Sequence, residues 1–297
     1  MSIPNKHSKG EKVFDIFNLI FMVILCAAFL YPVLNVLAMS LSGSGPIMRG
    51  EITFFPQQIT FTGYENVFSN AALWRAYGNT IFVATVGTTL GLAVNCLAAY
   101  PMAFGKFYGK KIYTFMILFT MWFGGGLIPT FLVMRNLGLT NSHWALIFLL
   151  LSSPFNVIIL RSFFASIPDA LIEAAKLDGA NDMYILMRIV LPLSKPVLAT
   201  VALWIMVAHW NDFLNPLIYL DDTHLQTLQI VLRDIVLTAT GGAQHGLDTA
   251  AQAGTGELLI PQQVQNAVIF VSMVPMLIVY PFLQKYFVKG VMIGSVK

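Results

Sequence analysis

Charged side chains gather in one short segment of an otherwise apolar chain, Ile167 to Pro196. With Arg161 just before it, this segment holds four acidic and four basic residues: Asp169, Glu173, Asp178, Asp182, Arg161, Lys176, Arg188 and Lys195. Two alanines, Ala174 and Ala175, follow Glu173 directly. Acids beside small side chains can form ion pairs with a basic groove that approaches closely. The chemistry that this segment favours is therefore docking to a partner.

A second polar cluster interrupts an apolar run near residue 210. Its members are His209, Trp210, Asn211, Asp212 and Asn215. His209, Asp212 and Asn215 have the spacing that shares one helix face. Amide and carboxylate groups can bind hydroxyls while an indole ring packs on an apolar face of a ligand. The cluster predicts a ligand pathway. Hydrogen bonds between helices, or an aspartate at the headgroup level, remain alternatives.

Other chemistries are excluded by what the sequence lacks. The five histidines and the two cysteines are scattered, and neither H-E-x-x-H nor G-x-S-x-G is present, so we expect no catalytic residues and no metal site. There is no G-x-x-x-x-G-K-[ST] motif, because Gly124–Gly126 is followed by Leu-Ile-Pro. We interpret these glycines as a kink or a close contact between helices. We expect no cofactor in this chain.

Composition shows what must position these clusters. Hydrophobic residues make up 57% of the chain and charged residues only 10%, against about 45–50% and about 25% in soluble domains. Both values indicate an all-α, polytopic membrane protein. The net charge of +3 is too small and too dispersed for nucleic-acid binding.

Six apolar stretches are long enough to span a bilayer, which takes about 20 residues each. They cover approximately residues 13–38, 79–104, 112–134, 142–164, 196–220 and 264–287. The first is too long for the apolar part of a signal peptide and is expected to remain as a span. Pro216 is expected to kink the fifth. Asn95, in the second, is expected to form a hydrogen bond between helices rather than to line a path. We expect residues 1–297 to form one transmembrane domain.

The basic residues predict the orientation of these spans. With the N-terminus in the cytoplasm, the inner segments hold Lys6, Lys9, Lys12, Lys106, Lys110, Lys111, Arg161, Lys176, Arg188, Lys195, Lys285, Lys289 and Lys297. The outer segments then hold only Arg49, Arg75, Arg135 and Arg233. Because basic residues concentrate in cytoplasmic loops, we expect both termini and the charged loop, residues 165–195, in the cytoplasm.

The charged loop is predicted to contain two short helices. The first should cover Ile167 to Leu177 and stop at Gly179, since glycine favours the residue after a helix end. One of its faces would carry Leu171, Ala174, Ala175 and Asp178. The second helix should begin after Asn181, end before Pro192, and present Tyr184, Ile185 and Ile189. The alternative, a helix lying on lipid headgroups, fits poorly because such helices favour Lys and Arg.

This loop resembles the EAA motif of ABC importer permeases. The residues that match are Glu173, Ala174, Ala175, Asp178, Gly179, Ala180, Ile189, Leu191, Pro192 and Pro196. Three further segments, Phe123–Leu139, His209–Leu220 and Tyr280–Ser295, are similar to the maltose-type carbohydrate permeases in the branch for oligosaccharides and polysaccharide fragments. The resemblance covers nearly the whole chain.

The resemblance implies a fold, partners and roles. The chain would be a six-span permease of the bacterial inner membrane, in contact with membrane lipid. It would pair with a second, homologous permease, with two ATPase subunits that bind ATP and magnesium, and with an extracytoplasmic sugar-binding protein that delivers an oligosaccharide. Glu173 would pair with a basic residue of the ATPase, and Gly179 would allow the bend between the two helices. The polar cluster at residues 209–215 would then contact the sugar.

The sequence also bears on two alternative functions and on the role of one outer loop. A secondary transporter or channel needs an ion relay within the membrane, and Asp212 is the only acid that we place well inside a span. An intramembrane enzyme needs a catalytic set that the sequence lacks. On the outside, the glycine-rich stretch Thr240–Gly256 is either a connector or a segment that reaches into the binding protein.

Overall fold

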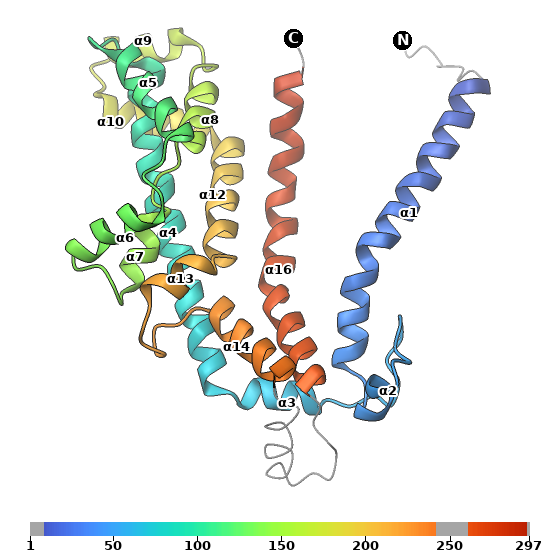
Figure 1. Ribbon diagram of the computed structural model, residues 1–297. Coiled ribbons are helices and arrows are strands. Elements are labelled where there is room, and N and C mark those ends of the chain that lie inside the picture. Colours follow the sequence, from blue (N-terminus) through green and yellow to red (C-terminus); the bar gives the residue numbers. More distant parts are fainter. Residues whose placement is uncertain (1–8, 242–260, 296–297) are drawn as a thin grey trace. The chain divides into compact units, whose positions relative to one another are not determined.

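The computed structural model describes residues 9–241 and 261–295, and this part of the chain is helical without any strand (Figure 1). The one strand-like contact in it is an isolated antiparallel pair, Ser42 with Ile59. This confirms the all-α class. The glycine-rich stretch Thr240–Gly256 lies, beyond Gly241, outside the described residues, so neither expectation for it is tested.

The chain divides into two compact units. The first joins Met1–Asn70 to Asp234–Met273, and the second joins Ala71–Arg233 to Val274–Lys297. The charged loop and the polar cluster at residues 209–215 both belong to the second unit.

In the described residues, three unbroken helices are long enough to span a membrane. They are α1 (Lys9–Ser40), α4 (Ala71–Phe104) and α16 (Pro261–Ser295), with 32, 34 and 35 residues. At about 1.5 Å per residue each exceeds the hydrocarbon thickness of about 30 Å. All three extend past the predicted limits, because polar flanks can continue a helix into the headgroup region.

The third and fourth predicted spans are each broken into two helices. The third consists of α5 (Lys110–Trp122) and α6 (Leu127–Asn136), bent by 113°, and the fourth of α7 (His143–Leu149) and α8 (Pro154–Phe164), bent by 52°. Gly126 has a φ of 82° at the first break, which confirms the predicted kink. A Cβ at Gly124 or Gly126 would meet no atom within 4 Å, so close packing does not explain these glycines.

The fifth span is also interrupted. Helix α12 (Lys195–Trp210) ends three residues before α13 (Leu214–Tyr219) begins. Pro216 explains the break, because its ring lacks a backbone N–H and clashes with the carbonyl four residues earlier. The segment Asp182–Leu193 meets α12 at 88°. Counting each bent pair as one span gives up to six candidate spans in the described residues; the cytoplasmic placement of the termini stays a prediction.

The core of the second unit lies around α4, α8 and α12. Buried residues of α4 (Cys96, Ala99, Tyr100, Met102), α8 (Val157, Leu160, Phe164) and α12 (Val197, Val201, Ile205) form one cluster with residues of the charged loop. In the first unit, α2 (Ser44–Met48) and α3 (Thr62–Ser69) follow α1, and α14 (Leu228–Gly241) begins in the second unit.

Candidate functional site

The charged loop folds into two helical segments, as predicted. The first is α9 (Asp169–Leu177), and the second runs through α10 (Asp182–Ile185), the π-turn η1 (Leu186–Val190) and α11 (Leu191–Leu193). The prediction that the second helix ends before Pro192 is wrong. A π-turn already displaces the usual hydrogen-bond partners, so a proline directly after it is tolerated.

Gly179 ends α9 in the way that the sequence predicts. Its φ is 82°, in the left-handed region that favours glycine. The Gly179 amide donates to the Lys176 carbonyl at 3.1 Å, and the Ala180 amide donates to the Ala175 carbonyl at 3.0 Å. These two bonds form a Schellman motif. They turn the chain sharply toward α10, where the Asn181 side chain accepts from the Tyr184 amide at 2.8 Å and caps the second helix.

The outer face of α9 differs from the predicted one. Ala175 is buried together with Ile172, whereas Leu171, Ala174 and Asp178 are exposed. The four residues expected on one exposed face are therefore divided between two sides of the helix. The small size of Ala175 brings α9 close to the core of the second unit, while that of Ala174 keeps the outer face thin. Ile185 of the second helix is likewise buried, not presented.

The remaining residues of the motif lie at or near the surface. Glu173, Gly179 and Pro192 are exposed, and Ala180, Ile189 and Leu191 are half-buried. Glu173 makes no hydrogen bond or ion pair with any other part of the described chain. It is thus an acid held on a fixed helix and available to a partner.

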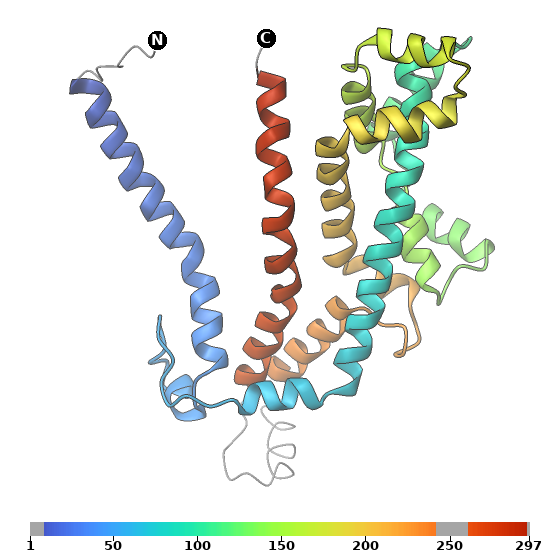
Figure 2. The ribbon, with the colours of Figure 1, turned by 180° about the vertical axis from the view of Figure 1, so that it is seen from behind.

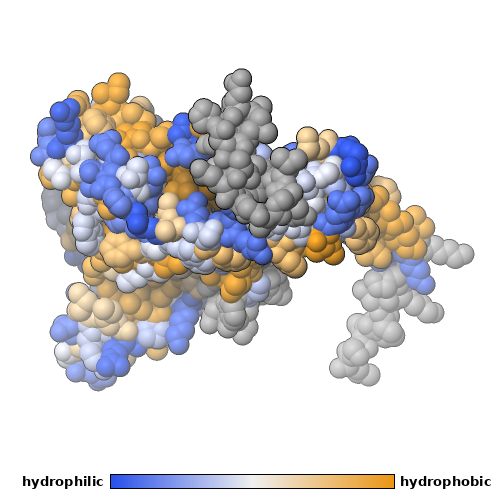
Figure 3. Space-filling model, turned by 90° about the horizontal axis from the view of Figure 1, so that it is seen from below, coloured by the Kyte–Doolittle hydropathy of each residue, from blue (hydrophilic) through white to orange (hydrophobic). Residues whose placement is uncertain are grey.

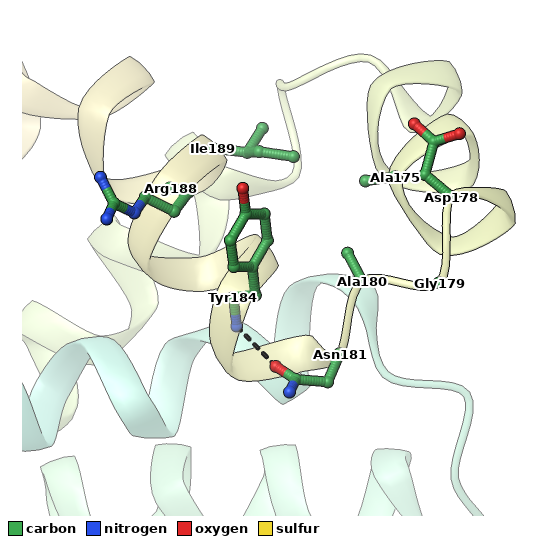
Figure 4. A pocket seen from close by; sticks show the side chains of 8 residues that line it. All are labelled: Ala175, Asp178, Gly179, Ala180, Asn181, Tyr184, Arg188 and Ile189. Carbon is green, nitrogen blue, oxygen red and sulfur yellow. Dashed lines mark hydrogen bonds between the residues drawn. The ribbon is translucent and has the colours of Figure 1, made fainter.

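A groove of about 510 Å³ separates the end of α9 from the second helix. Its lining residues are Ala175, Asp178, Gly179, Ala180, Asn181, Tyr184, Arg188 and Ile189. Figure 4 shows Tyr184 and Ile189 standing between α9 on one side and Arg188 on the other. The groove has the acid Asp178 and small residues at one end, the base Arg188 at the other, and Tyr184 and Ile189 between them, which suits an inserted helix or side chain of mixed polarity.

Asp182 links three elements, a role that the sequence analysis missed. Its carboxylate accepts from the Tyr100 hydroxyl of α4 at 3.1 Å and lies 3.5 Å from the Lys176 ammonium of α9. The six-residue spacing from Lys176 crosses a turn, so helix periodicity does not reveal the pair. The ion pair is exposed and therefore weak, whereas the hydrogen bond to buried Tyr100 is partly shielded from solvent; together they connect α9, α10 and α4.

The loop is also attached through its apolar side. Ile172, Ala175, Ile185, Leu186 and Val190 belong to the same buried cluster as residues of α4, α8 and α12. Since protein interiors are close-packed, a displacement of α9 is transmitted to these helices rather than absorbed in the loop.

The structure separates the polar residues predicted to line a pathway. The break after Trp210 takes His209 off the face of Asp212 and Asn215, so the prediction of a shared helix face is wrong. His209 is 3% exposed and packs on α4, where a Cβ on Gly87 would lie 2.3 Å from its Nε2. Trp210 is also buried and Asn211 is exposed. The pathway role of these residues stays a prediction.

Asp212 and Asn215 are engaged with each other. The Asp212 carboxylate accepts from the Asn215 backbone amide at 3.2 Å and from its side-chain amide at 3.0 Å. This arrangement caps the first turn of α13. Both residues are half-buried, so their outer sides remain accessible.

A pocket of about 480 Å³ lies where α7, α8 and α12 meet, and the sequence analysis did not find it. Its lining residues are Leu149, Leu150, Ser152, Ser153, Pro154, Phe155, Asn156, Trp204, Ile205 and Ala208. The Phe155 and Trp204 rings lie 5.5 Å apart. The stretch Ser152–Asn156, polar and with a proline, was the available signal, because it interrupts an apolar span.

Asn95 of α4 holds one wall of this pocket. Its side-chain amide donates to the Leu151 carbonyl at 3.3 Å, and its oxygen accepts from the Ser153 amide at 3.2 Å. Backbone groups freed by the break between α7 and α8 are thereby satisfied, as buried backbone requires. Asn95 therefore forms the predicted hydrogen bond between helices, and it also positions Ser152 and Ser153.

Comparison with known proteins relates the whole chain to transport permeases. A family model described as "Binding-protein-dependent transport system inner membrane component" matches residues 82–293. Protein LplC of Bacillus subtilis (strain 168) is 40% identical, over 98% of this chain and 97% of that protein. The polygalacturonan/rhamnogalacturonan transport system permease protein YtcP of the same strain is 36% identical, over 97% of this chain and 99% of that protein. Among solved structures, the fold matches a chain in the crystal structure of a bacterial ABC transporter involved in the import of the acidic polysaccharide alginate. The TM-score is 0.87 and the sequence identity is 32%, over 95% of this chain and 99% of that chain.

Proposed function

The chain belongs to the family of inner membrane components of binding-protein-dependent transport systems, and from this premise we propose that it is the permease subunit of an ATP-driven importer of oligosaccharides. It forms part of the path through the membrane and carries no ATPase of its own. A second permease, two ATPase subunits with ATP and magnesium, and an external sugar-binding protein complete the assembly. The names of the relatives support a carbohydrate fragment as the cargo.

The charged loop is the proposed contact with the ATPase. The observation that carries this assignment is that Glu173 stands exposed and unpaired within the described chain on a helix fixed at both ends. Gly179 fixes the C-terminal end through the Schellman motif, and Ile172 and Ala175 anchor the helix to the core. When the ATPase subunits close on ATP, a basic residue paired with Glu173 would pull α9 with it.

Helices α8 and α12 connect this loop with the pocket. The α8 residues Leu160 and Phe164 pack against the loop, whereas Phe155, at its other end, lines the pocket. In α12, Val197 belongs to the core beside the loop and Trp204 lines the pocket. Movement of α9 would therefore change the shape of the pocket, as a shift of packed helices does.

The pocket is the proposed place where sugar passes this subunit. The rings of Phe155 and Trp204 can pack on the apolar faces of a sugar, and Ser152, Ser153 and Asn156 can bind its hydroxyls. The pocket lining contains no basic side chain. A carboxylate on the sugar would therefore need its partner elsewhere in the assembly, so the pocket by itself selects for sugar rather than for charge.

The substitution Glu173→Ala tests the proposal in the assembled importer, reconstituted with its binding protein. Removing one partner of a buried ion pair costs about 3–5 kcal/mol. We expect sugar-stimulated ATP hydrolysis and co-purification of the ATPase to fall strongly while the two permeases still assemble. Radiolabelled oligosaccharide uptake should fall in parallel.

Two variants serve as controls. Glu173→Gln removes the charge and keeps the shape, and we expect it to behave like Glu173→Ala. Asp169→Asn alters another exposed acid of α9 and should leave coupling intact. If Glu173→Ala binds and stimulates the ATPase normally, Glu173 has no coupling role; if the unchanged complex shows no ATPase response to any sugar-loaded binding protein, the importer assignment itself is wrong.

A further inference from the structure

The segment after α1 folds back along that helix, within the first unit. The Asn35 side-chain amide of α1 donates to the Thr53 carbonyl at 2.8 Å, and the Thr60 amide donates to the Leu41 carbonyl at 3.0 Å. The Gly43 amide binds the Gln57 carbonyl at 3.1 Å. These contacts form a hairpin with Phe54, Phe55 and Pro56 at its tip. In Figure 2 it rises beside the end of α1.

The tip lies well inside the end of α1. The Phe54 ring packs edge-on against the Tyr31 ring, with centroids 5.0 Å apart. Tyr31 precedes the last residue of α1, Ser40, by nine residues, which is about 14 Å of helix. About 20 apolar residues from Val13 reach Pro32. A span of this length that starts at Val13 places Tyr31 near the border between hydrocarbon and headgroups, within an apolar stretch that continues to Ala38.

The side chains on the hairpin are apolar where it reaches deepest. Phe54 is 51% exposed and Phe55 is 81% exposed. Ile52 instead is buried with Ala38 and Ile47 and fastens the hairpin to α1. Figure 3 looks onto the side of α2 and α3 and shows hydrophilic residues interrupted by hydrophobic ones.

The charged residues of the hairpin lie at its base and neutralise each other. The Arg49 guanidinium donates to the Glu51 carboxylate at 2.7 and 3.1 Å. This hydrogen bond lowers the pKa of Glu51 and raises that of Arg49, so both are ionised at neutral pH. No lysine lies between Val13 and Lys106, so the hairpin does not rely on anionic lipid.

We propose that the Phe54–Phe55 tip is a lipid anchor that inserts into the headgroup layer at the end of α1. Phe side chains bury their apolar area at the boundary between headgroups and acyl chains, and the amphipathic ring of Tyr31, against which Phe54 packs, favours the same depth. Asn35, Ser42 and Leu41 satisfy backbone groups of Thr53, Gln57 and Thr60 on either side of the tip, and the hydrated headgroup layer can satisfy the backbone groups of the tip itself, which the hydrocarbon could not. By the orientation that the lysines predict, this is the outer leaflet.

The lipid assignment follows from continuity with α1. The tip packs on Tyr31, inside the apolar stretch of α1, where the neighbouring side chains Phe29 and Leu30 are also exposed in the described chain. An anchor there would hold the first span and the outer segment at a constant depth while other helices move. The inference does not depend on the sugar or on the ATPase contact.

Nitroxide labelling in the assembled importer, embedded in phosphatidylcholine nanodiscs, tests the anchor. Cys26 and Cys96 are first replaced by alanine, and a single cysteine is introduced as Phe55→Cys. Collisions with oxygen, which enters lipid, are compared with collisions with a water-soluble nickel chelate. Ser69→Cys, exposed on α3, is the aqueous control, and Ile24→Cys in α1 is the lipid reference.

We expect the oxygen-to-nickel ratio at residue 55 to be several-fold above that at residue 69 and below that at residue 24. A ratio equal to that at residue 69 would show an aqueous loop and overturn the proposal. Low accessibility to both reagents would show that protein covers the tip, from the second permease or the binding protein, and would also overturn it. Phe54→Cys repeats the measurement if the Phe55 variant does not assemble.

Discussion

At the scale of single residues, the size of a side chain decides how closely helices approach. Gly87 and Gly91 of α4 leave room for His209 and Ile205 of α12. Because the His209 ring is buried, it has no free space into which to move. These small residues, rather than the polar groups alone, determine where the pathway residues point.

Gly87→Ala should destabilise the permease. Its Cβ would lie 2.3 Å from His209 Nε2, and overpacking of a core costs about 1–3 kcal/mol. We expect a lower midpoint of thermal unfolding in detergent. Gly78→Ala, in the same helix, meets no atom within 4 Å and should be neutral or slightly stabilising. Adding His209→Ala to Gly87→Ala should restore stability; no restoration would refute the steric explanation.

Trp204→Ala should weaken sugar transport without loss of stability comparable to that of Gly87→Ala. Trp204 is exposed beside Phe155 in the pocket, and a loss of about 1–2 kcal/mol of contact with sugar corresponds to about 5- to 30-fold. The loss is measured as the rate of sugar uptake at a subsaturating concentration of the sugar-loaded binding protein. Trp144→Ala removes an exposed ring outside the pocket and serves as the control. Equal uptake by both variants would place the sugar elsewhere.

At the scale of elements, short breaks divide the third, fourth and fifth spans into two helices each. The break in the third span follows from glycine, that in the fifth from proline, and that in the fourth comes with a polar Ser152–Ser153 step that Asn95 satisfies. In the charged loop, the turn at Gly179 sets the angle between α9 and the second helix. The breaks in the fourth and fifth spans free backbone groups that a neighbouring side chain satisfies, Asn95 at the first and Asp212 at the second.

Gly179→Ala should impair coupling. A residue with a Cβ costs about 1–2 kcal/mol more in the left-handed region, so the end of α9 would shift or unwind. We expect lower ATPase stimulation with normal assembly of the two permeases. Gly179→Asn should be milder, since asparagine tolerates this conformation. If both variants couple as well as the unchanged chain, the fixed turn is not needed for coupling.

At the scale of the whole molecule, charge asymmetry predicts which ends face the cytoplasm. Lysines lie only in segments assigned to one side of the membrane, and the charged loop belongs to that side. The same orientation places the Phe54–Phe55 anchor and α3 on the opposite side.

Topology can be measured with a membrane-impermeant maleimide in spheroplasts, in the cysteine-free background. Tyr108→Cys, fully exposed between α4 and α5, should react only after permeabilisation. Ser69→Cys should react without it. The reverse pattern would invert the orientation and exclude the loop as a contact for a cytoplasmic ATPase.

Much of the fold and of the charged loop could be predicted from the sequence. The apolar stretches determined an all-helical membrane protein with up to six spans, since their length and composition suffice for a bilayer. Gly179 determined the end of α9, because the left-handed turn depends on one residue type. Both features are local, so they need no knowledge of distant neighbours.

Only the tertiary structure decided which faces are buried and where polar groups meet. Ala175 turned inward because α9 packs on α4 and α8, and periodicity on α9 alone cannot say which side meets the core. Asp182 met Tyr100, and Trp204 met Phe155, across long stretches of sequence. The pocket arises where the break between α7 and α8 meets the neighbouring helix α12, which depends on packing between helices and not on any one segment.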